Sequence, residues 1–151
     1  MREFTHCLIA ACAVRGIHII VTNVARHVIE QAALFAQGRK TLTEVNQLRT
    51  IAGLPEITAT ENQKVVTWTM KSKHIIDRDN ESLCDDFSRA VDIAVVRGDG
   101  KATWNLKADV NKNSVPDYEE VGRIALEVDP SVVWGGFWKK KDYPHFEEGI
   151  T

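Results

Sequence analysis

The chain has 151 residues, a length that suits one domain with a core of useful size. Hydrophobic residues make up 44% of it and charged residues 26%, as in ordinary soluble globular proteins, and its formal net charge of −2 gives no reason to expect tight binding to nucleic acid. The 3 cysteines are an odd number without C-x-x-C spacing, which argues against a disulfide framework and against a cysteine-based zinc site.

The first half of the chain predicts two helices and one strand. A helix is expected over residues 3–14, with "CLIAACAV" as its buried face, because this segment is too short to span a membrane and lacks the flanks of a signal peptide. "GIHIIVT" (residues 16–22) is rich in β-branched residues and predicts a buried strand. "RHVIEQAALFAQG" has helical spacing and ends at Gly38. Residues 39–63 are polar, and we expect a long irregular connection there.

The second half predicts strands at residues 64–68 and 89–96, followed by a hairpin through the turn "RGDGK". "PDYEEVGRIALEVD" predicts the clearest helix, and Asp117 with Glu120 resembles a capping box at its start. The order of elements predicts an α+β fold, in which helices pack on a small, mainly antiparallel sheet. We see no linker, so we expect one domain over residues 1–151 and no separate cell-wall-binding domain.

Two histidines and one aspartate stand out because of their surroundings. In the strand "RAVDIAVV", Asp92 shares a face with small apolar residues, and a buried, unpaired carboxylate costs several kcal/mol. It therefore needs a metal, a hydrogen-bond donor or a structural cation such as an arginine. Pro144 favours an extended "PHFEE", whose alternation places His145 and Glu147 on one face and Phe146 on the other, toward the core.

A third candidate ligand follows the strand expected at residues 64–68. Taken alone, His74 reads more often as a surface histidine than as a ligand. Together with Asp92 and His145 it supplies two imidazoles and one carboxylate, a sensible tetrahedral zinc set with one position open for water. Asp142, three residues before His145, then becomes the candidate general base, with Glu147 as the next candidate.

These residues resemble a known family. "SKH…SRAVDI…WGGFWKKKDYPHFE" is similar to the zinc-dependent D-Ala-D-Ala carboxypeptidases and L-alanyl-D-glutamate peptidases of family M15, and most of all to their bacteriophage endolysin branch. "VTNVARHVIEQAALFAQGR" is similar to that family's V-T-S-G-x-R…Q…L-x-x-G-R stretch. The resemblance runs from about Val21 to Glu147. Its departures are Asn23-Val24 in place of Ser-Gly, Ser88 in place of Gly, and a longer gap between His74 and Asp92.

The resemblance implies zinc ligands at His74, Asp92 and His145, with Asp142 as the catalytic base. It places Arg26 as a catalytic residue that binds a substrate carboxylate or polarises the scissile carbonyl. The remaining residues that it implies at the substrate are Gln31, Ser72, Trp138 and Trp134, although core packing explains either tryptophan equally well.

The function that follows is an endolysin-type hydrolase of peptidoglycan stem peptides, expected to cut the L-Ala-D-Glu bond. The alternatives are a D,D-carboxypeptidase or dipeptidase acting on D-Ala-D-Ala ends, and a catalytically silent zinc-containing domain that binds cell wall. As a phage lysin, the protein is expected to be a monomer that stays in the host cytoplasm before lysis, without inserting into membrane.

A second metal is suggested by "DVNKNSVPDYEE", where a calcium loop is the alternative to an Asn-rich turn. The match is weakened by Ser114, which stands where calcium loops carry Gly. Another acidic run, residues 77–86, favours a solvated insertion near the cleft over a metal site. The candidate calcium ligands are Asp109, Asn111, Asn113, Val115 (through its carbonyl), Asp117 and Glu120.

Overall fold

The computed structural model describes residues 1–76 and 88–149, and the chain divides into two compact units. Unit 1 combines Met1–Val24 with the chain from Arg89 onward, and unit 2 runs from Ala25 to Ser88. The expectation of one catalytic domain stays a prediction about the chain as a whole. Within the described ranges, no helix is long and apolar enough to cross a membrane.

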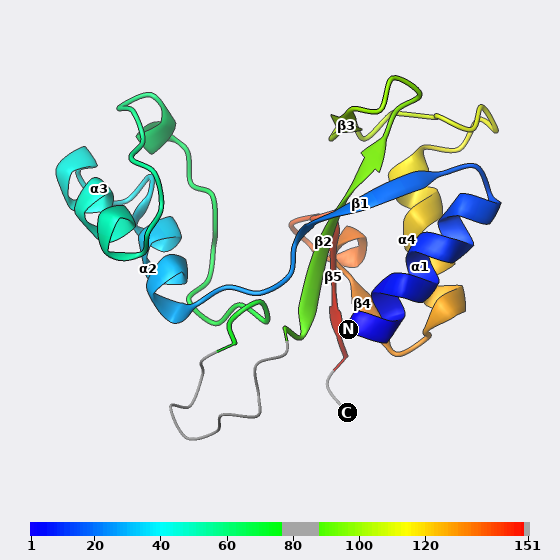
Figure 1. Ribbon diagram of the computed structural model, residues 1–151, viewed down its shortest axis with the longest axis horizontal. Coiled ribbons are helices and arrows are strands. Elements are labelled where there is room, and N and C mark those ends of the chain that lie inside the picture. Colours follow the sequence, from blue (N-terminus) through cyan, green and yellow to red (C-terminus); the bar gives the residue numbers. More distant parts are fainter. Residues whose placement is uncertain (77–87, 150–151) are drawn as a thin grey trace. The chain divides into compact units, whose positions relative to one another are not determined.

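The sheet of unit 1 is antiparallel throughout its described strands (Figure 1). The main path runs in the order β1-β2-β5-β4, and the short β3 pairs with the far end of β2. β2 is therefore the central strand, and β1 and β4 form the edges of that path. The strands are β1 (His18–Asn23), β2 (Ala90–Val96), β3 (Ala102–Thr103), β4 (Val132–Trp134) and β5 (His145–Glu148).

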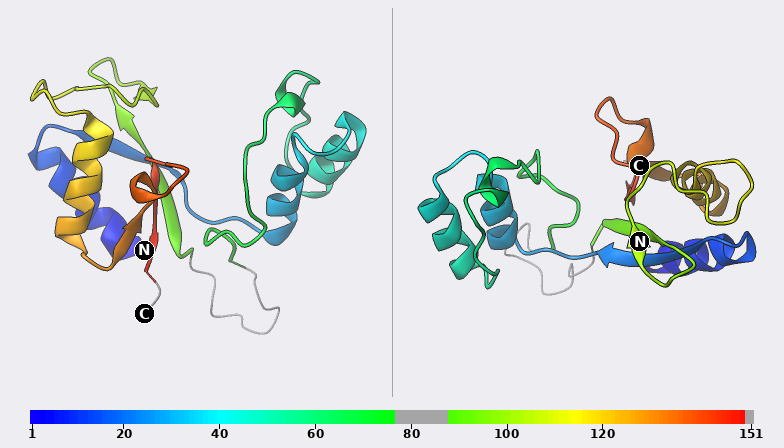
Figure 2. Two further views of the ribbon diagram at one scale, coloured as in Figure 1. Left: turned by 180° about the vertical axis from the view of Figure 1, so that it is seen from behind. Right: turned by 90° about the horizontal axis from the view of Figure 1, so that it is seen from above.

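Two helices, α1 (Arg2–Val14) and α4 (Asp117–Val128), pack against each other and against one face of this sheet (Figure 2). The shared core takes one face of β1, β2, β4 and β5, and every second residue of β2 is fully buried in it. This confirms the expected α+β fold with helices on a small antiparallel sheet. The main core residues are Leu8, Cys12, Ile17, Val91, Ile93, Val95, Tyr118, Val121, Ile124 and Phe146.

The strand expected at residues 89–96 and its hairpin are confirmed. The amide of Arg97 donates to the carbonyl of Lys101 at 2.9 Å, and the amide of Gly100 donates to the carbonyl of Arg97 at 2.9 Å. Gly100 has a φ of 77°, a left-handed conformation that only glycine adopts at little cost. The turn returns the chain so that Ala102 pairs with Val96.

Unit 2 contains helices α2 (Val28–Ala36) and α3 (Leu42–Ile51) and the short 3₁₀ helix η1 (Glu61–Gln63). The expectation of an irregular connection over residues 39–63 is therefore wrong. α3 begins with a capping box, in which Thr41 accepts from the amide of Glu44 at 3.3 Å and Glu44 accepts from the amide of Thr41 at 3.0 Å. These bonds satisfy backbone donors that a helix start leaves without partners.

The strand expected at residues 64–68 is also absent among the described residues of unit 2. Side chains take the place of a partner strand. Arg39 donates to the carbonyl of Thr67 at 3.0 Å, and Gln31 donates to the carbonyl of Thr69 at 2.6 Å. The segment is thus held by side chains of helix α2 and the residues that follow it, although its β-branched sequence is typical of a strand.

Candidate metal centre

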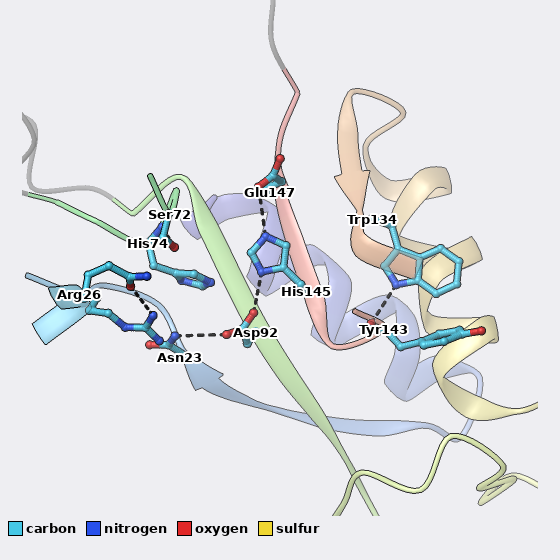
Figure 3. A network of polar contacts seen from close by, with 10 residues as sticks. Asn23, Arg26, Ser72, His74, Asp92, Trp134, Tyr143, His145 and Glu147 are labelled. Atoms are coloured by element: carbon cyan, nitrogen blue, oxygen red, sulfur yellow. Dashed lines mark hydrogen bonds and ion pairs between the residues drawn. The ribbon is translucent and has the colours of Figure 1, made fainter. Parts of the chain in front are cut away.

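The part of the candidate metal centre that lies in unit 1 is built on a contact between two neighbouring strands. β2 and β5 pair with Asp92 opposite His145, and Nδ1 of His145 lies 2.8 Å from Oδ1 of Asp92 (Figure 3). Phe146 points the other way, into the core, where its ring lies 6.1 Å from that of Phe4. The expected alternation of His145 and Phe146 is therefore confirmed, and the pleat presents both Asp92 and His145 on the sheet face away from α1 and α4.

Asn23 holds the second oxygen of Asp92. The ladder between β1 and β2 is irregular between Val21 and Asn23, and this bulge brings Asn23 opposite Asp92. Its Nδ2 donates to Oδ2 of Asp92 at 3.2 Å. Asn23 is one of the departures from the family's pattern, and its amide orients a carboxylate of the centre. The sequence marks Asn23 as a departure from the family's pattern, but no local pattern predicts its hydrogen bond to Asp92.

Negative charge surrounds the His145 ring. Its side chain is 9% exposed, and Nε2 lies 3.2 Å from Oε2 of Glu147, so each ring nitrogen contacts a carboxylate. Burial by itself lowers the pKa of His145, but the hydrogen bond and charge of Asp92, the hydrogen bond to Glu147 and the charge of Asp142 together raise it above its ordinary value. The site therefore favours a cation, and its imidazole and carboxylate donors are of the kinds that zinc prefers.

The loop before β5 explains the spacing of the C-terminal motif. After β4 comes the 3₁₀ helix η2 (Gly135–Phe137), and the carbonyl of Gly135 accepts from the amide of Asp142 at 3.0 Å. The carbonyl of Asp142 then accepts from the amide of His145 at 3.2 Å. Asp142 is exposed at this turn, on a backbone tied at one end to Gly135 and at the other to His145.

The two tryptophans of the motif differ in their surroundings. Trp134 is 5% exposed, belongs to the core, and donates from Nε1 to the carbonyl of Tyr143 at 2.9 Å. Trp138 is half-buried, and its ring centroid lies 5.0 Å from that of His145. Core packing therefore accounts for Trp134, whereas Trp138 borders the centre.

The remaining expected site residues lie in unit 2. Arg26 and His74 are joined through the backbone, because the amide of Arg26 donates to the carbonyl of His74 at 2.8 Å. The hydroxyl of Ser72 accepts from the amide of His74 at 3.3 Å, and the side chain of His74 is buried. Arg26 donates to Oε1 of the fully buried Gln31 at 2.7 Å. A partnership of His74 with residues of unit 1 is a proposal.

One buried side-chain atom among the described residues of unit 2 lacks a hydrogen bond. Nε of Arg26 is buried and has no hydrogen-bond partner among the described residues, although Oε1 of Glu30 lies 3.9 Å away. A buried donor without a partner is costly, so this atom is suited to an acceptor from a ligand.

The acidic run at residues 77–86 lies outside the described residues.

The predicted calcium loop is closed by its own side chains. Asp109 accepts from the amides of Asn113 and Ser114 at 3.0 and 2.9 Å, and the side-chain amide of Asn113 donates to Glu120 at 2.6 Å. Ser114 has a φ of 68°, the left-handed conformation usually adopted by glycine.

The capping box expected at the start of helix α4 is wrong, because the buried Asp117 instead accepts from the amide of Val110 at 3.0 Å.

Three comparisons place the chain among known proteins. A family model described as D-alanyl-D-alanine carboxypeptidase matches residues 86–148. Peptidoglycan L-alanyl-D-glutamate endopeptidase CwlK of Bacillus subtilis (strain 168) is 30% identical over 148 residues, which cover 97% of this chain and 70% of the relative. The crystal structure of the L-Ala D-Glu endopeptidase ChiX of Serratia marcescens is similar in fold, with a TM-score of 0.53 at 17% identity over 98% of this chain and 79% of that one.

The fold and these matches define a hydrolase of the metallopeptidase class. The chain belongs to the M15 family of peptidases, whose members depend on zinc. The match at residues 86–148 spans Asp92, Asp142 and His145.

Gly135 offers a test of the loop. A methyl group there would clash with the carbonyl oxygen of Asp142, so we expect Gly135→Ala to lower the free energy of unfolding by about 1–3 kcal/mol and to reduce peptidase activity. Urea unfolding and a peptidoglycan assay measure the two effects. Gly98→Ala is the matched control, because a methyl group at Gly98 meets nothing within 4 Å. Equal stability of the two variants would contradict the proposed packing.

The calcium assignment stays a prediction with a direct test. If the loop binds calcium, the ion stabilises the folded state by mass action, so calcium raises the melting temperature of the wild type. We expect Asp109→Ala to abolish that rise, because the loop would lose its first carboxylate ligand. A differential scanning measurement with calcium and with a calcium chelator provides both readings. Identical wild-type melting temperatures in the two conditions would exclude the site.

Proposed function

We propose that this protein is a zinc-dependent peptidoglycan peptidase of the endolysin type, which hydrolyses the L-Ala-D-Glu bond of the stem peptide. The observation that carries the proposal is the 30% identity, over 97% of the chain, to a peptidoglycan L-alanyl-D-glutamate endopeptidase. The contact between Asp92 and His145 supports it from the structure, because it supplies two donors suited to zinc on one face of a rigid sheet.

His74 is the third proposed ligand. Each of His74, Asp92 and His145 offers one ligand atom, and together they leave the fourth position of a tetrahedral zinc open. When bound, zinc lowers the pKa of a water molecule toward about 7 and polarises the scissile carbonyl. The burial of His74 and its backbone tie to Arg26 support this role, because both restrict where its ring can lie.

Asp142 is the proposed general base. Its carboxylate takes a proton from the attacking water as the oxygen bonds to the carbonyl carbon, and it delivers a proton to the amine nitrogen as the C–N bond breaks. Exposure of Asp142 supports this role, because the group must reach substrate. So does the backbone bond between the two residues, because the carbonyl of Asp142 accepts from the amide of His145 at 3.2 Å and keeps the aspartate next to the proposed ligand.

Four residues are proposed to bind substrate. Arg26 presents a buried Nε that lacks a hydrogen bond, and a carboxylate of the stem peptide or the oxyanion of the transition state would satisfy it. Gln31 holds the guanidinium of Arg26 in place. Ser72 is proposed to orient His74 or to bind substrate, and Trp138 to form a wall beside His145.

A D,D-carboxypeptidase acting on D-Ala-D-Ala ends is the second candidate, because the family model that matches residues 86–148 carries that description. As an endolysin, the protein is proposed to be a monomer that waits in the host cytoplasm and then acts on the wall, without binding nucleic acid or inserting into membrane. The composition and the net charge of −2 support the absence of nucleic-acid binding.

Digestion of purified peptidoglycan tests the proposal. We expect the zinc-loaded protein to release new N-terminal D-Glu, identified by mass spectrometry, and we expect a zinc chelator to prevent this. Released D-Ala would instead support the carboxypeptidase. Intact peptidoglycan would contradict both activities and favour a silent, zinc-containing wall-binding domain.

Two variants in the same assay separate metal binding from proton transfer. We expect Asp142→Asn to keep bound zinc but to lose about 10²–10⁴-fold in rate, because the general base is removed. His145→Ala should lose the zinc itself. The control is Asp99→Asn, which changes an exposed aspartate that pairs with Arg97 in the hairpin turn. Full activity of Asp142→Asn would place the base elsewhere.

A further inference from the structure

The ring of His145 is held from both ends. Nδ1 lies 2.8 Å from Oδ1 of Asp92 on β2, and Nε2 lies 3.2 Å from Oε2 of Glu147 on β5 (Figure 3). A neutral imidazole has one N–H group and one acceptor nitrogen, so the partner of one nitrogen decides what the other can do. Asp92 is a proposed metal ligand, whereas the role of Glu147 was left open by the sequence.

The position of Glu147 follows from the strand. It stands two residues after His145, and alternation puts both side chains on the same face while the buried Phe146 anchors the opposite face. In the ladder, Glu147 stands opposite the small Ala90 on β2 and opposite Val133 on β4. Its side chain is 18% exposed, so water reaches its carboxylate only in part and the bond to His145 matters more than it would at the surface.

We infer that Glu147 is a positioning residue for the metal centre: its carboxylate accepts the Nε2–H of His145, so that Nδ1, on the side of Asp92, is the unprotonated nitrogen available to a metal. This inference rests on the proposed zinc set of the preceding subsection. A ligating imidazole must present a bare nitrogen, and a carboxylate on the other nitrogen fixes the tautomer, holds the ring plane and raises the basicity of the ligating atom.

The same geometry argues against Glu147 as the general base. Its carboxylate lies at Nε2, and Nε2 is the ring nitrogen opposite to the one beside Asp92. A general base must approach the water that attacks the substrate, and this water is expected on the side of the ring where Asp92 would bind the metal. Glu147 is bonded to the remote side, which suits an orienting role and leaves the proton transfer to Asp142.

Zinc affinity of the metal-free protein, measured by competition with a chromophoric chelator, tests this role without any substrate. Glu147→Met removes the acceptor at similar side-chain size, and Glu147→Gln keeps an acceptor oxygen but removes the charge. Glu148→Met is the matched control on the next residue, whose carboxylate pairs with Arg89 and the N-terminus. Far-UV circular dichroism establishes that each variant is folded.

We expect Glu147→Met to weaken zinc binding by about 10–100-fold, as loss of a carboxylate behind a metal-binding histidine usually does. Glu147→Gln should lose clearly less, because its amide oxygen still accepts from Nε2, and Glu148→Met should bind zinc as the wild type does. Unchanged zinc affinity in Glu147→Met would overturn the inference, and so would an equal loss in Glu147→Met and Glu147→Gln. An equal loss in Glu148→Met would assign the effect to general destabilisation of the strand.

These results are independent of the substrate. If zinc affinity responds as expected but peptidoglycan remains intact, the proposed peptidase activity fails while the role of Glu147 stands. If peptidoglycan is cleaved but zinc affinity is unchanged by substitution of Glu147, the proposed peptidase activity stands while the role of Glu147 fails. For a Glu147→Met variant that does not fold, Glu147→Gln carries the test: its zinc affinity should fall measurably below that of the wild type, because a neutral acceptor leaves the ligating nitrogen less basic, and wild-type affinity would overturn the inference.

Discussion

The pairing of β2 with β5 is the constraint on which the rest of the centre depends. In this register Asp92 stands opposite His145, and Val91 stands opposite Phe146. A shift of one residue would turn His145 into the core and Phe146 onto the polar face. Full burial of a phenylalanine side chain stabilises the folded state by about 1.5–3 kcal/mol. A shifted register would lose this contribution from Phe146, so the observed register, which places the polar pair together, is favoured. The hydrophobic core thus determines where the two candidate ligands meet.

The polar face of that register carries more negative charge than one histidine balances well. Asp92 and Glu147 contact the ring and the charge of Asp142 acts on it, so its pKa is raised although burial opposes the charged form. Asn23 adds a neutral donor to Asp92. A divalent cation would satisfy this arrangement more fully than a proton, because it can bind a carboxylate and an imidazole nitrogen at once. The backbone of Asp142 is placed by its bond to Gly135, where no side chain would fit.

The sequence predicted much of this through patterns that depend on close neighbours. Alternation around Phe146 gave the orientation of His145, and the run of β-branched residues around Asp92 gave its strand. Helix α3 was missed although Thr41 and Glu44 form a capping box, because its polar sequence has a weak apolar stripe. The strand expected at residues 64–68 is absent because Gln31 and Arg39, distant in sequence, hold that segment. The contacts of Asn23 and Glu147 likewise depend on register and on a bulge, which no local pattern reveals.

Anomalous X-ray diffraction at the zinc edge, from crystals of the zinc-loaded protein, tests the metal assignment most directly. The proposed centre predicts one strong peak at about 2.0–2.2 Å from a carboxylate oxygen of Asp92 and from Nδ1 of His145, with Nε2 still bonded to Glu147. A peak bonded to Nε2 of His145, or one that touches neither Asp92 nor His145, would contradict it.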